Sequence, residues 1–413
     1  MTKRTPCPTP LAAAVFAACL LPALAAPPAA TPQKPESVGI SSERLGRIHE
    51  MVMTRVKENA VSGAVTIVAR KGKVVHFEAH GLMDIESKKP MTKDALFRLA
   101  STTKPLTAAA ILILMEEGKL LLTDPVSKFI PEFRAPKVAT DKGLVPATRG
   151  ITILDLLTHT SGLGSGGAAV AEFQQVLKSR TPDDTLATFI PKYGALPLDF
   201  QPGAEWRYSG LAGFDTLGRI VEIASGMGFS EFLQARLFKP LGMNDTWFNV
   251  PEKEAPRQVT IYRRTSAGLE RADAIPQTGG PKFPSGAGGL YSTAADFLRF
   301  AQMLANGGIL DGKRILSPWT VDLMMSNQVG DLFLGKSGRS LKGIGFGLGG
   351  EVVLNSVEAR LRKPNGTYGW DGAFGTYWTA NRKEQLVTIL FIQTPGRAIH
   401  HDFDNAVAQA VIE

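Results

Sequence analysis

Ser101 and Lys104 are the first residues whose types and spacing are suited to chemistry. They stand three positions apart in the stretch FRLASTTKPLT, residues 97–107. Near the start of a helix, side chains three positions apart share one face, and the helix N-terminus stabilises negative charge on a serine oxygen. A lysine in an apolar setting loses its proton more easily than one in water, so it can act as a base. The same pattern also fits a serine that only caps a helix.

Tyr208 is the second candidate. It lies in the stretch PGAEWRYSGLAGF, where a Pro-Gly turn leads into a predicted helix, so its phenol can project from a loop into a cleft. A phenol beside an ammonium group has a lowered pKa and can transfer a proton. The alternative is a tyrosine that only packs at the entry of the helix.

A third candidate is the glycine-rich stretch YGWDGAFGTYW, residues 368–378. Gly369, Gly372 and Gly375 stand in a strand-like segment, where glycine marks a close approach of a ligand or of another backbone. Such a strand can direct a backbone N–H at a developing oxyanion. The alternative is an edge strand with aromatic packing.

Other patterns that carry chemistry are absent from the sequence. No serine stands in a Gly-x-Ser-x-Gly motif, and neither the P-loop nor the dinucleotide-binding pattern occurs. The segment HFEAH, residues 76–80, offers two histidines, but on a predicted strand side chains four positions apart are separated by about 13 Å. We therefore expect no metal site and no cofactor.

The composition is that of an ordinary globular protein. Of the 413 residues, 44% are hydrophobic and 20% are charged. The formal net charge of +8 is spread along the chain in short pieces. Since no block of like charge occurs, we expect no nucleic-acid partner.

The N-terminus is typical of a secretory signal peptide. Residues 1–25 combine a basic start, an apolar core and a small-residue cleavage pattern. The apolar run is shorter than the ~20 residues of a membrane-spanning helix and contains Pro22. We expect a periplasmic or secreted protein with no stable membrane span after cleavage. Cys7 and Cys19 both lie in this segment, so no disulfide framework is expected.

Elements along the chain predict an α+β (α/β) fold in one domain. Residues 26–37 form a linker, and the domain covers residues 38–413. A β-hairpin near its start and several strands near its end predict one antiparallel sheet built from both termini and flanked by helices. This α/β lobe is expected at about 38–120 and 340–413, with a mainly helical inserted lobe at about 121–339.

The three candidate motifs, in this order, resemble the serine β-lactamase/penicillin-binding-protein superfamily. The most similar branch is the class C β-lactamase-like hydrolases, which includes the family VIII carboxylesterases. The resemblance runs from about residue 38 to the C-terminus and includes LLTHTSGL, LFKPLGMNDTWF and GAGGLYSTAADFLRFAQMLANGG. It implies the β-lactamase/transpeptidase-like fold.

The resemblance also implies roles for the candidate residues. Ser101 would be the acylated nucleophile, Lys104 would share the role of base, and Tyr208 would relay the proton to the leaving group and activate the deacylating water. The backbone N–H groups of Ser101 and Ala373 would form the oxyanion hole, and Trp370 would line the substrate pocket. The reaction is a two-step acyl transfer without cofactor.

Two departures from the family pattern bear on the substrate. Gly210 stands where the second motif often has asparagine, and Trp370, Asp371 and Gly372 replace the Lys-Thr-Gly of true lactamases. Tryptophan carries no charge, and an inward-facing Asp371 would repel an anionic substrate, whereas an outward-facing one would form a pair behind the site. Esterase branches of the family carry tryptophan here, which favours neutral, short-chain esters.

Two other functions remain open. One is a β-lactamase or a D-amino-acid peptidase of the DD-carboxypeptidase type, which export would suit. The other is a sensor or binding protein that is acylated without turnover. We expect a small-molecule ester as the partner, and a monomer or weak homo-oligomer.

Overall fold

The computed structural model describes residues 1–3, 32–272, 278–334, 342–396 and 398–413. Most of the predicted signal peptide and half of the predicted linker lie outside the described residues. Within the described ranges, no helix combines the length and the apolarity needed to cross a bilayer.

A large antiparallel sheet forms the centre of the fold. Its eight described strands lie in the order β12-β13-β14-β15-β16-β1-β2-β3. They are β1 (Gly63–Arg70), β2 (Lys73–Asp84), β3 (Lys89–Pro90), β12 (Ile344–Phe346), β13 (Glu351–Val353), β14 (Tyr368–Asp371), β15 (Tyr377–Asn381) and β16 (Leu386–Phe391). The two ends of the chain meet where β1 pairs with β16, with Val65 opposite Phe391 and Arg70 opposite Leu386. The predicted antiparallel sheet built from both termini is confirmed.

The hairpin of β1 and β2 follows directly from its residues. Its strands are rich in β-branched side chains, which favour the extended backbone. At the turn, Lys71 and Gly72 both have positive φ, 48° and 76°. Two consecutive positive φ angles match the right-handed twist of the strands that the turn joins.

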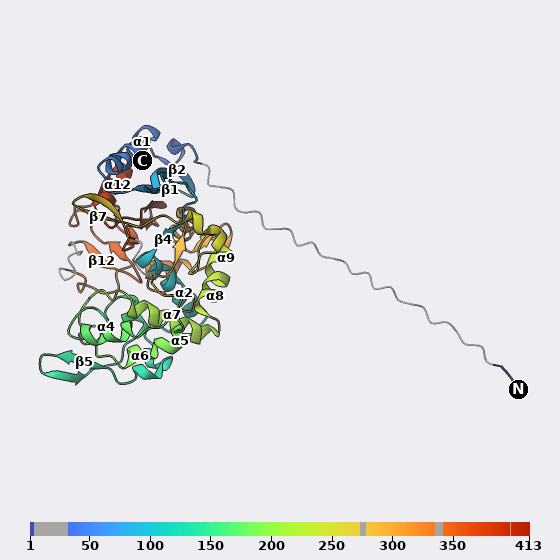
Figure 1. Ribbon diagram of the computed structural model, residues 1–413, viewed down its shortest axis with the longest axis vertical. Coiled ribbons are helices and arrows are strands. Elements are labelled where there is room, and N and C mark those ends of the chain that lie inside the picture. The colour runs from blue at the N-terminus through green and yellow to red at the C-terminus, as the bar shows by residue number, and fades with distance from the viewer. Residues whose placement is uncertain (4–31, 273–277, 335–341, 397) are drawn as a thin grey trace.

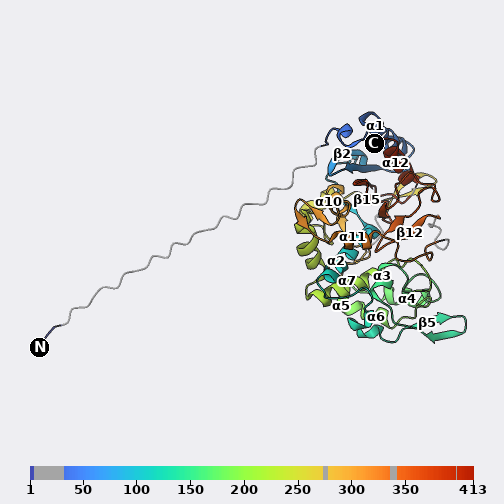
Figure 2. The same cartoon turned by 180° about the vertical axis from the view of Figure 1, so that it is seen from behind.

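Helices cover both faces of the sheet. On one face, α1 (Ser42–Lys57) and α12 (Ala398–Ala408) pack together on β1, β2 and β16 (Figure 1). On the other face, α10 (Ala294–Ala305) packs on β1, β15 and β16. Figure 2 shows α10 beside β15, with α2 and α7 between the sheet and the far end of the molecule.

Helix α2 (Lys104–Glu116) is buried and packs against α7 of the inserted lobe. All its residues from Lys104 to Leu114 are buried, as expected for a helix that is apolar all round. Pro105 lies in its first turn, where no backbone N–H is needed. The remaining helices are α3 (Ile153–Leu157), α4 (Val170–Lys178), α5 (Leu186–Phe189), α6 (Pro191–Gly194), α7 (Ala212–Ser225), α8 (Phe229–Leu233), α9 (Lys239–Leu241) and α11 (Pro318–Met324).

Short strand pairs interrupt the segment predicted to be mainly helical, and one of them pairs a strand of this segment with β4, which precedes it. They are β4 (Phe97–Arg98) with β9 (Tyr291–Ser292), β5 (Lys137–Thr140) with β6 (Gly143–Pro146), β7 (Tyr262–Thr265) with β8 (Gly268–Arg271), and β10 (Ile309–Leu310) with β11 (Lys313–Arg314). The hairpin of β5 and β6 is mostly exposed, so it lacks the apolar alternation that indicates a strand in sequence.

The stretch ITILDLLTHTSGL is another difference from the sequence-based expectation. It lies in the segment expected to be mainly helical, but helix α3 ends at Leu157. His159 then takes a left-handed conformation, with φ of 59°, which ends helical hydrogen bonding. The chain after α3 is therefore free to turn back toward α7, and this loop becomes part of the candidate site.

Candidate active site

Ser101 lies at the entrance of α2, where the chain turns sharply from β4. It belongs to the 3₁₀-helical turn η2 (Ala100–Thr103), which continues directly into α2. Ala100, the preceding residue, has a φ of 46°. A non-glycine residue in this region is strained, and such strain is often found where a side chain must be held for function.

Lys104 is completely buried beneath Ser101. Its Nζ lies 3.3 Å from the Ser101 Oγ and donates to the carbonyl oxygens of Gly210, at 2.9 Å, and Ala287, at 2.8 Å. Among the described residues, no carboxylate lies within ion-pair distance of this lysine. Its polar partners are therefore two carbonyls and one hydroxyl.

Tyr208 reaches the same serine from the loop before α7. Its hydroxyl donates to the Ser101 Oγ at 2.7 Å, across 107 positions of sequence. The Lys104 Nζ lies 5.0 Å from the centre of the Tyr208 ring and 5.5 Å from that of Phe214. The three residues singled out in sequence thus meet at one oxygen atom.

His159 holds the Tyr208 loop in place, and the sequence analysis missed it. Its Nδ1 accepts the backbone N–H of Ser209 at 3.2 Å, and its carbonyl oxygen accepts that of Arg207 at 3.1 Å. Its buried ring lies 4.6 Å from the Tyr208 ring. The one signal in sequence was its place in LLTHTSGL, a segment that had no role attached to it.

Asp215 is a second positioning residue that the sequence analysis missed. On α7, its carboxylate accepts hydrogen bonds from the Ser285 hydroxyl at 2.6 Å and from the Ala287 N–H at 3.1 Å. This fixes the loop whose Ala287 carbonyl binds Lys104. Complete burial raises the pKa of Asp215 to about 6, while its hydrogen bonds and the charge of Lys104 act in the opposite direction.

Gly372 allows strand β14 to approach the Ser101 turn. A Cβ on this glycine would lie 2.2 Å from the Thr376 Oγ1 and 2.3 Å from the Leu99 carbonyl oxygen, so no other residue fits without displacement. Thr376 also donates to the Leu99 carbonyl at 2.9 Å and joins the two segments.

Two backbone amides near this junction remain available. In the described part of the chain, neither the Ser101 N–H nor the Ala373 N–H donates to a protein acceptor. Ala373 is exposed at the turn after β14, and η2 contacts β14. Two such amides can bind the oxygen of a polarised carbonyl.

Trp370 and Asp371 lie on opposite faces of β14. Trp370 is buried, with its ring 5.6 Å from that of Tyr208 and 5.3 Å from that of Phe346. Asp371 stands opposite Tyr377 in the β14–β15 register, on the face covered by α12. Because successive strand residues point to opposite faces, Asp371 has the outward orientation, away from Ser101.

Both the sequence and the fold match known proteins. Residues 48–411 match the family described as Beta-lactamase. Protein Rv1367c of Mycobacterium tuberculosis is 38% identical over 352 residues, which cover 81% of this chain and 86% of the relative. Esterase EstB of Burkholderia gladioli is 33% identical over 379 residues, which cover 86% of this chain and 92% of the relative.

A solved structure agrees with this relationship. The structure titled "EstCE1, a hydrolase with promiscuous acyltransferase activity" is 27% identical, covers 90% of this chain and 99% of its own, and superposes with a TM-score of 0.77. The match confirms the β-lactamase-like fold, with its antiparallel sheet flanked by helices. The family match spans most of the sequence, so this chain belongs to the beta-lactamase family.

Proposed function

We propose that this protein is an exported serine hydrolase that cleaves short-chain carboxylic esters through a covalent acyl-enzyme. The observation that carries the proposal is the meeting of the Lys104 amine and the Tyr208 hydroxyl at the Ser101 oxygen. A nucleophile with two proton-transfer partners is what acyl transfer requires.

The hydrogen bonds of Lys104 suit the role of a base. A neutral amine has two N–H groups and one lone pair. The carbonyls of Gly210 and Ala287 take the two N–H groups, which leaves the lone pair facing the Ser101 hydroxyl. Hydroxyl protons rotate to suit their partners, so Ser101 can donate its proton along this contact.

In the acylation step, the Ser101 oxygen attacks the ester carbonyl and its proton passes to Lys104. The carbonyl oxygen, which gains negative charge, is bound by the amides of Ser101 and Ala373. When the bond to the alcohol breaks, Tyr208 donates a proton to the leaving oxygen and recovers one from Lys104. Water then attacks the acyl-enzyme by the reverse proton path and releases the acid.

An ester substrate is favoured by the chemistry around the serine. Trp370 lies where a lactamase of this family has a cation, and Asp371 faces away, so neither residue offers a positive charge to a substrate carboxylate. The relatives named as an esterase and as a hydrolase with acyltransferase activity support the same substrate class.

The test is the turnover of p-nitrophenyl butyrate and of nitrocefin by the mature protein. Ser101→Ala should lower ester kcat by about 10⁴-fold or more, because the serine acts as part of a unit. Ser266→Ala, on an exposed turn, is the matched control and should keep full activity.

Other results would change the assignment. Strong nitrocefin turnover that depends on Ser101 would point to a β-lactamase. A stable acyl-enzyme without turnover would point to a sensor. Ester hydrolysis that survives in Ser101→Ala would overturn the proposal.

Export rests on residues 1–25 alone, nearly all of which lie outside the described part of the chain. Expression of the full sequence should yield a shortened protein outside the cytoplasm, with Ala26 at or near its N-terminus by terminal sequencing. An intact N-terminus in the cytoplasmic fraction would contradict export but would leave the esterase proposal untouched.

A further inference from the structure

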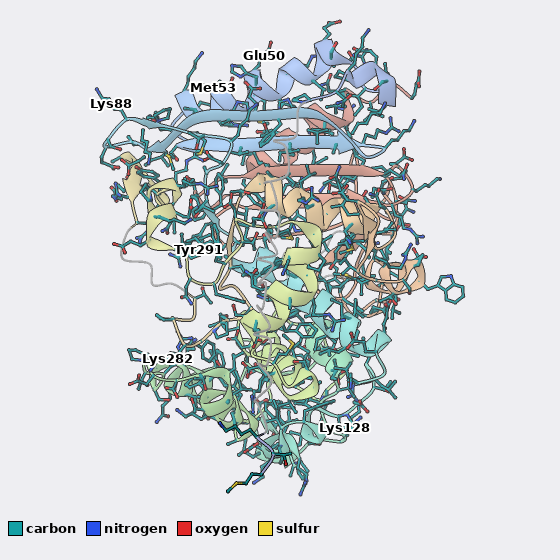
Figure 3. All side chains as sticks on the ribbon, turned by 90° about the vertical axis from the view of Figure 1, so that its right-hand side faces the viewer. Glu50, Met53, Lys88, Lys128, Lys282 and Tyr291 are labelled. Atoms are coloured by element: carbon teal, nitrogen blue, oxygen red, sulfur yellow. The ribbon has the colours of Figure 1, made fainter. Side chains whose placement is uncertain are left out.

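Strand β2 presents a row of titratable side chains to helix α1. His76, Glu78 and His80 alternate along the strand, so all three point to the same face. Opposite them in the register stand Val68, Thr66 and Ala64 of β1, in that order. The same face carries α1, which Figure 3 shows lying along the strands, with Glu50 and Met53 labelled on it.

Helix α1 adds His49 to this row. The His49 Nδ1 lies 2.5 Å from the Glu78 Oε1, and the His80 Nδ1 lies 3.8 Å from the same oxygen. The three potential ligand atoms are all within 4.8 Å of one another. Ligand atoms around a tetrahedral zinc ion are about 3.3 Å apart. The His49 and Glu78 side chains are 53% and 36% exposed, so they have room for the small rotation needed.

The buried member of the cluster has an unused nitrogen. His80 is almost completely buried, and its Nδ1 has no hydrogen-bond partner in the described structure. Its other nitrogen, Nε2, lies 2.8 Å from the Thr66 Oγ1, which can accept the Nε2–H. That hydrogen bond fixes the ring and leaves the Nδ1 lone pair directed at His49 and Glu78, as outer partners do for metal-binding histidines.

The hydroxyl of Thr66 also holds the neighbouring histidine. Its Oγ1 lies 2.7 Å from the His76 Nε2, so the hydroxyl can accept from His80 and donate to His76.

We propose that His49, Glu78 and His80 together bind one divalent transition-metal ion, with zinc as the best fit and water in the remaining position. Two imidazoles and one carboxylate suit zinc, copper or nickel, whereas magnesium and calcium prefer oxygen ligands. The sequence analysis expected no metal site, because His49 lies on a different element from the HFEAH segment.

The proposed site is separate from the Ser101 site. The ligands lie on the α1 face of the sheet, while the other face of β1 packs through Val65 and Ile67 into the core that contains α2. The ion would join α1 to β2. Its binding should therefore stabilise the fold without being needed for ester turnover.

The test uses the full mature chain, purified without a histidine tag and treated with chelator. Titration with ZnCl2 by calorimetry should show a single saturable site. His49→Ala and Glu78→Gln should each weaken binding at least about tenfold. Both residues are partly exposed, so these variants should fold. His401→Ala, which removes an exposed histidine elsewhere, is the matched control and should bind as the wild type does.

Thermal unfolding gives a second readout. ZnCl2 should raise the Tm of the wild type and of His401→Ala, but not that of His49→Ala, because only a ligand of the folded state stabilises it. MgCl2 should not raise the Tm. The proposal is overturned if the wild type shows no saturable binding, if His49→Ala and Glu78→Gln bind as tightly as the wild type, or if His401→Ala weakens binding equally.

Discussion

Lys104 and Lys363 lie on opposite sides of strand β14 and differ in their partners. Lys104, beneath Ser101, contacts two carbonyls and a hydroxyl. Lys363, on the α12 side, forms an ion pair with Asp404 at 2.8 Å and donates to the hydroxyl of Tyr377. A carboxylate holds an ammonium by direct attraction, whereas neutral acceptors also accommodate a neutral amine.

The comparison separates a site built for proton transfer from one built for cohesion. On the Lys104 side, the hydroxyls of Ser101 and Tyr208 share one short network with an amine. On the Lys363 side, the charges are paired with each other. The two neighbouring residues Trp370 and Asp371 of β14 also point to opposite sides. Trp370 faces the Lys104 side and Asp371 faces the Lys363 side.

The largest difference between the two regions should appear on replacing each lysine with methionine. Lys104→Met should lower ester kcat by about 10³-fold, because it removes the proton acceptor for Ser101. Lys363→Met should keep its turnover but lose about 3 kcal/mol of stability, because Asp404 is left buried without its partner. Steady-state kinetics and urea unfolding of both variants measure this. A Lys104→Met enzyme within tenfold of the wild type would break the comparison.

Asp215, the buried carboxyl group that fixes the Ala287 loop around Lys104, should make the stability of the protein depend on pH. The folded-state pKa of Asp215, about 6, lies above its ordinary value of 3.8. The folded state therefore binds the proton of the Asp215 carboxyl group more tightly than the unfolded state does. The contribution of this group to the free energy of unfolding falls as the pH rises from about 4 to 6. Asp215→Asn lacks this loss. The variant should gain about 2.4 kcal/mol relative to the wild type between pH 4 and pH 7.

Urea unfolding of both proteins at the two pH values measures this gain. His76 and His80 titrate in the same range with the opposite sign, but they are present in both proteins, so their effect cancels in the difference. An unchanged difference between pH 4 and pH 7 would show that folding does not raise the pKa of Asp215.

Two glycine variants test whether the close approach of β14 to the Leu99–Ser101 segment positions the site. Gly372→Ala should lower kcat/KM by about 10²-fold, because its Cβ would displace β14 from the Leu99–Ser101 segment. Gly46→Ala is the matched control, since Gly46 is exposed on α1 and a Cβ there meets nothing within 4 Å. It should stay close to wild-type activity in the same ester assay. Equal losses in the two variants would argue against close approach as the reason for Gly372.

The smallest expected difference concerns the two faces of β14. Trp370→Ala should lower kcat/KM by about tenfold, since it removes a ring that packs against Tyr208. Asp371→Asn should change kcat/KM by no more than about twofold, because its side chain lies on the other face. Ester kinetics of the pair measure this, and a larger loss in Asp371→Asn would place that carboxylate at the substrate.

The features that could be predicted from the sequence are those set by neighbouring residues and those implied by the resemblance to the family. The spacing of Ser101 and Lys104 is readable because three positions at a helix start define one face. The antiparallel sheet is readable from the hairpin at residues 63–81 and the late strands. The contact of Tyr208 with Ser101 spans 107 positions, so only the resemblance could propose it.

The remaining features depend on tertiary packing. The direction of Asp371 follows from which residue of β15 it faces, and spacing leaves that register open. His159 acts through backbone groups of another loop, so nothing near it in sequence marks the role. His49 meets Glu78 only because α1 packs on β2, and single-sequence patterns do not contain that packing.

The most direct test of the central claim is mass spectrometry of the protein quenched during turnover of p-nitrophenyl butyrate. Tyr208→Phe, which should slow deacylation, is run beside the wild type and Ser101→Ala. We expect a butyryl group on the peptide that contains Ser101, more abundant in Tyr208→Phe and absent from Ser101→Ala. Ester turnover without an adduct on that peptide in any variant, and undiminished in Ser101→Ala, would contradict a serine acyl-enzyme at this position.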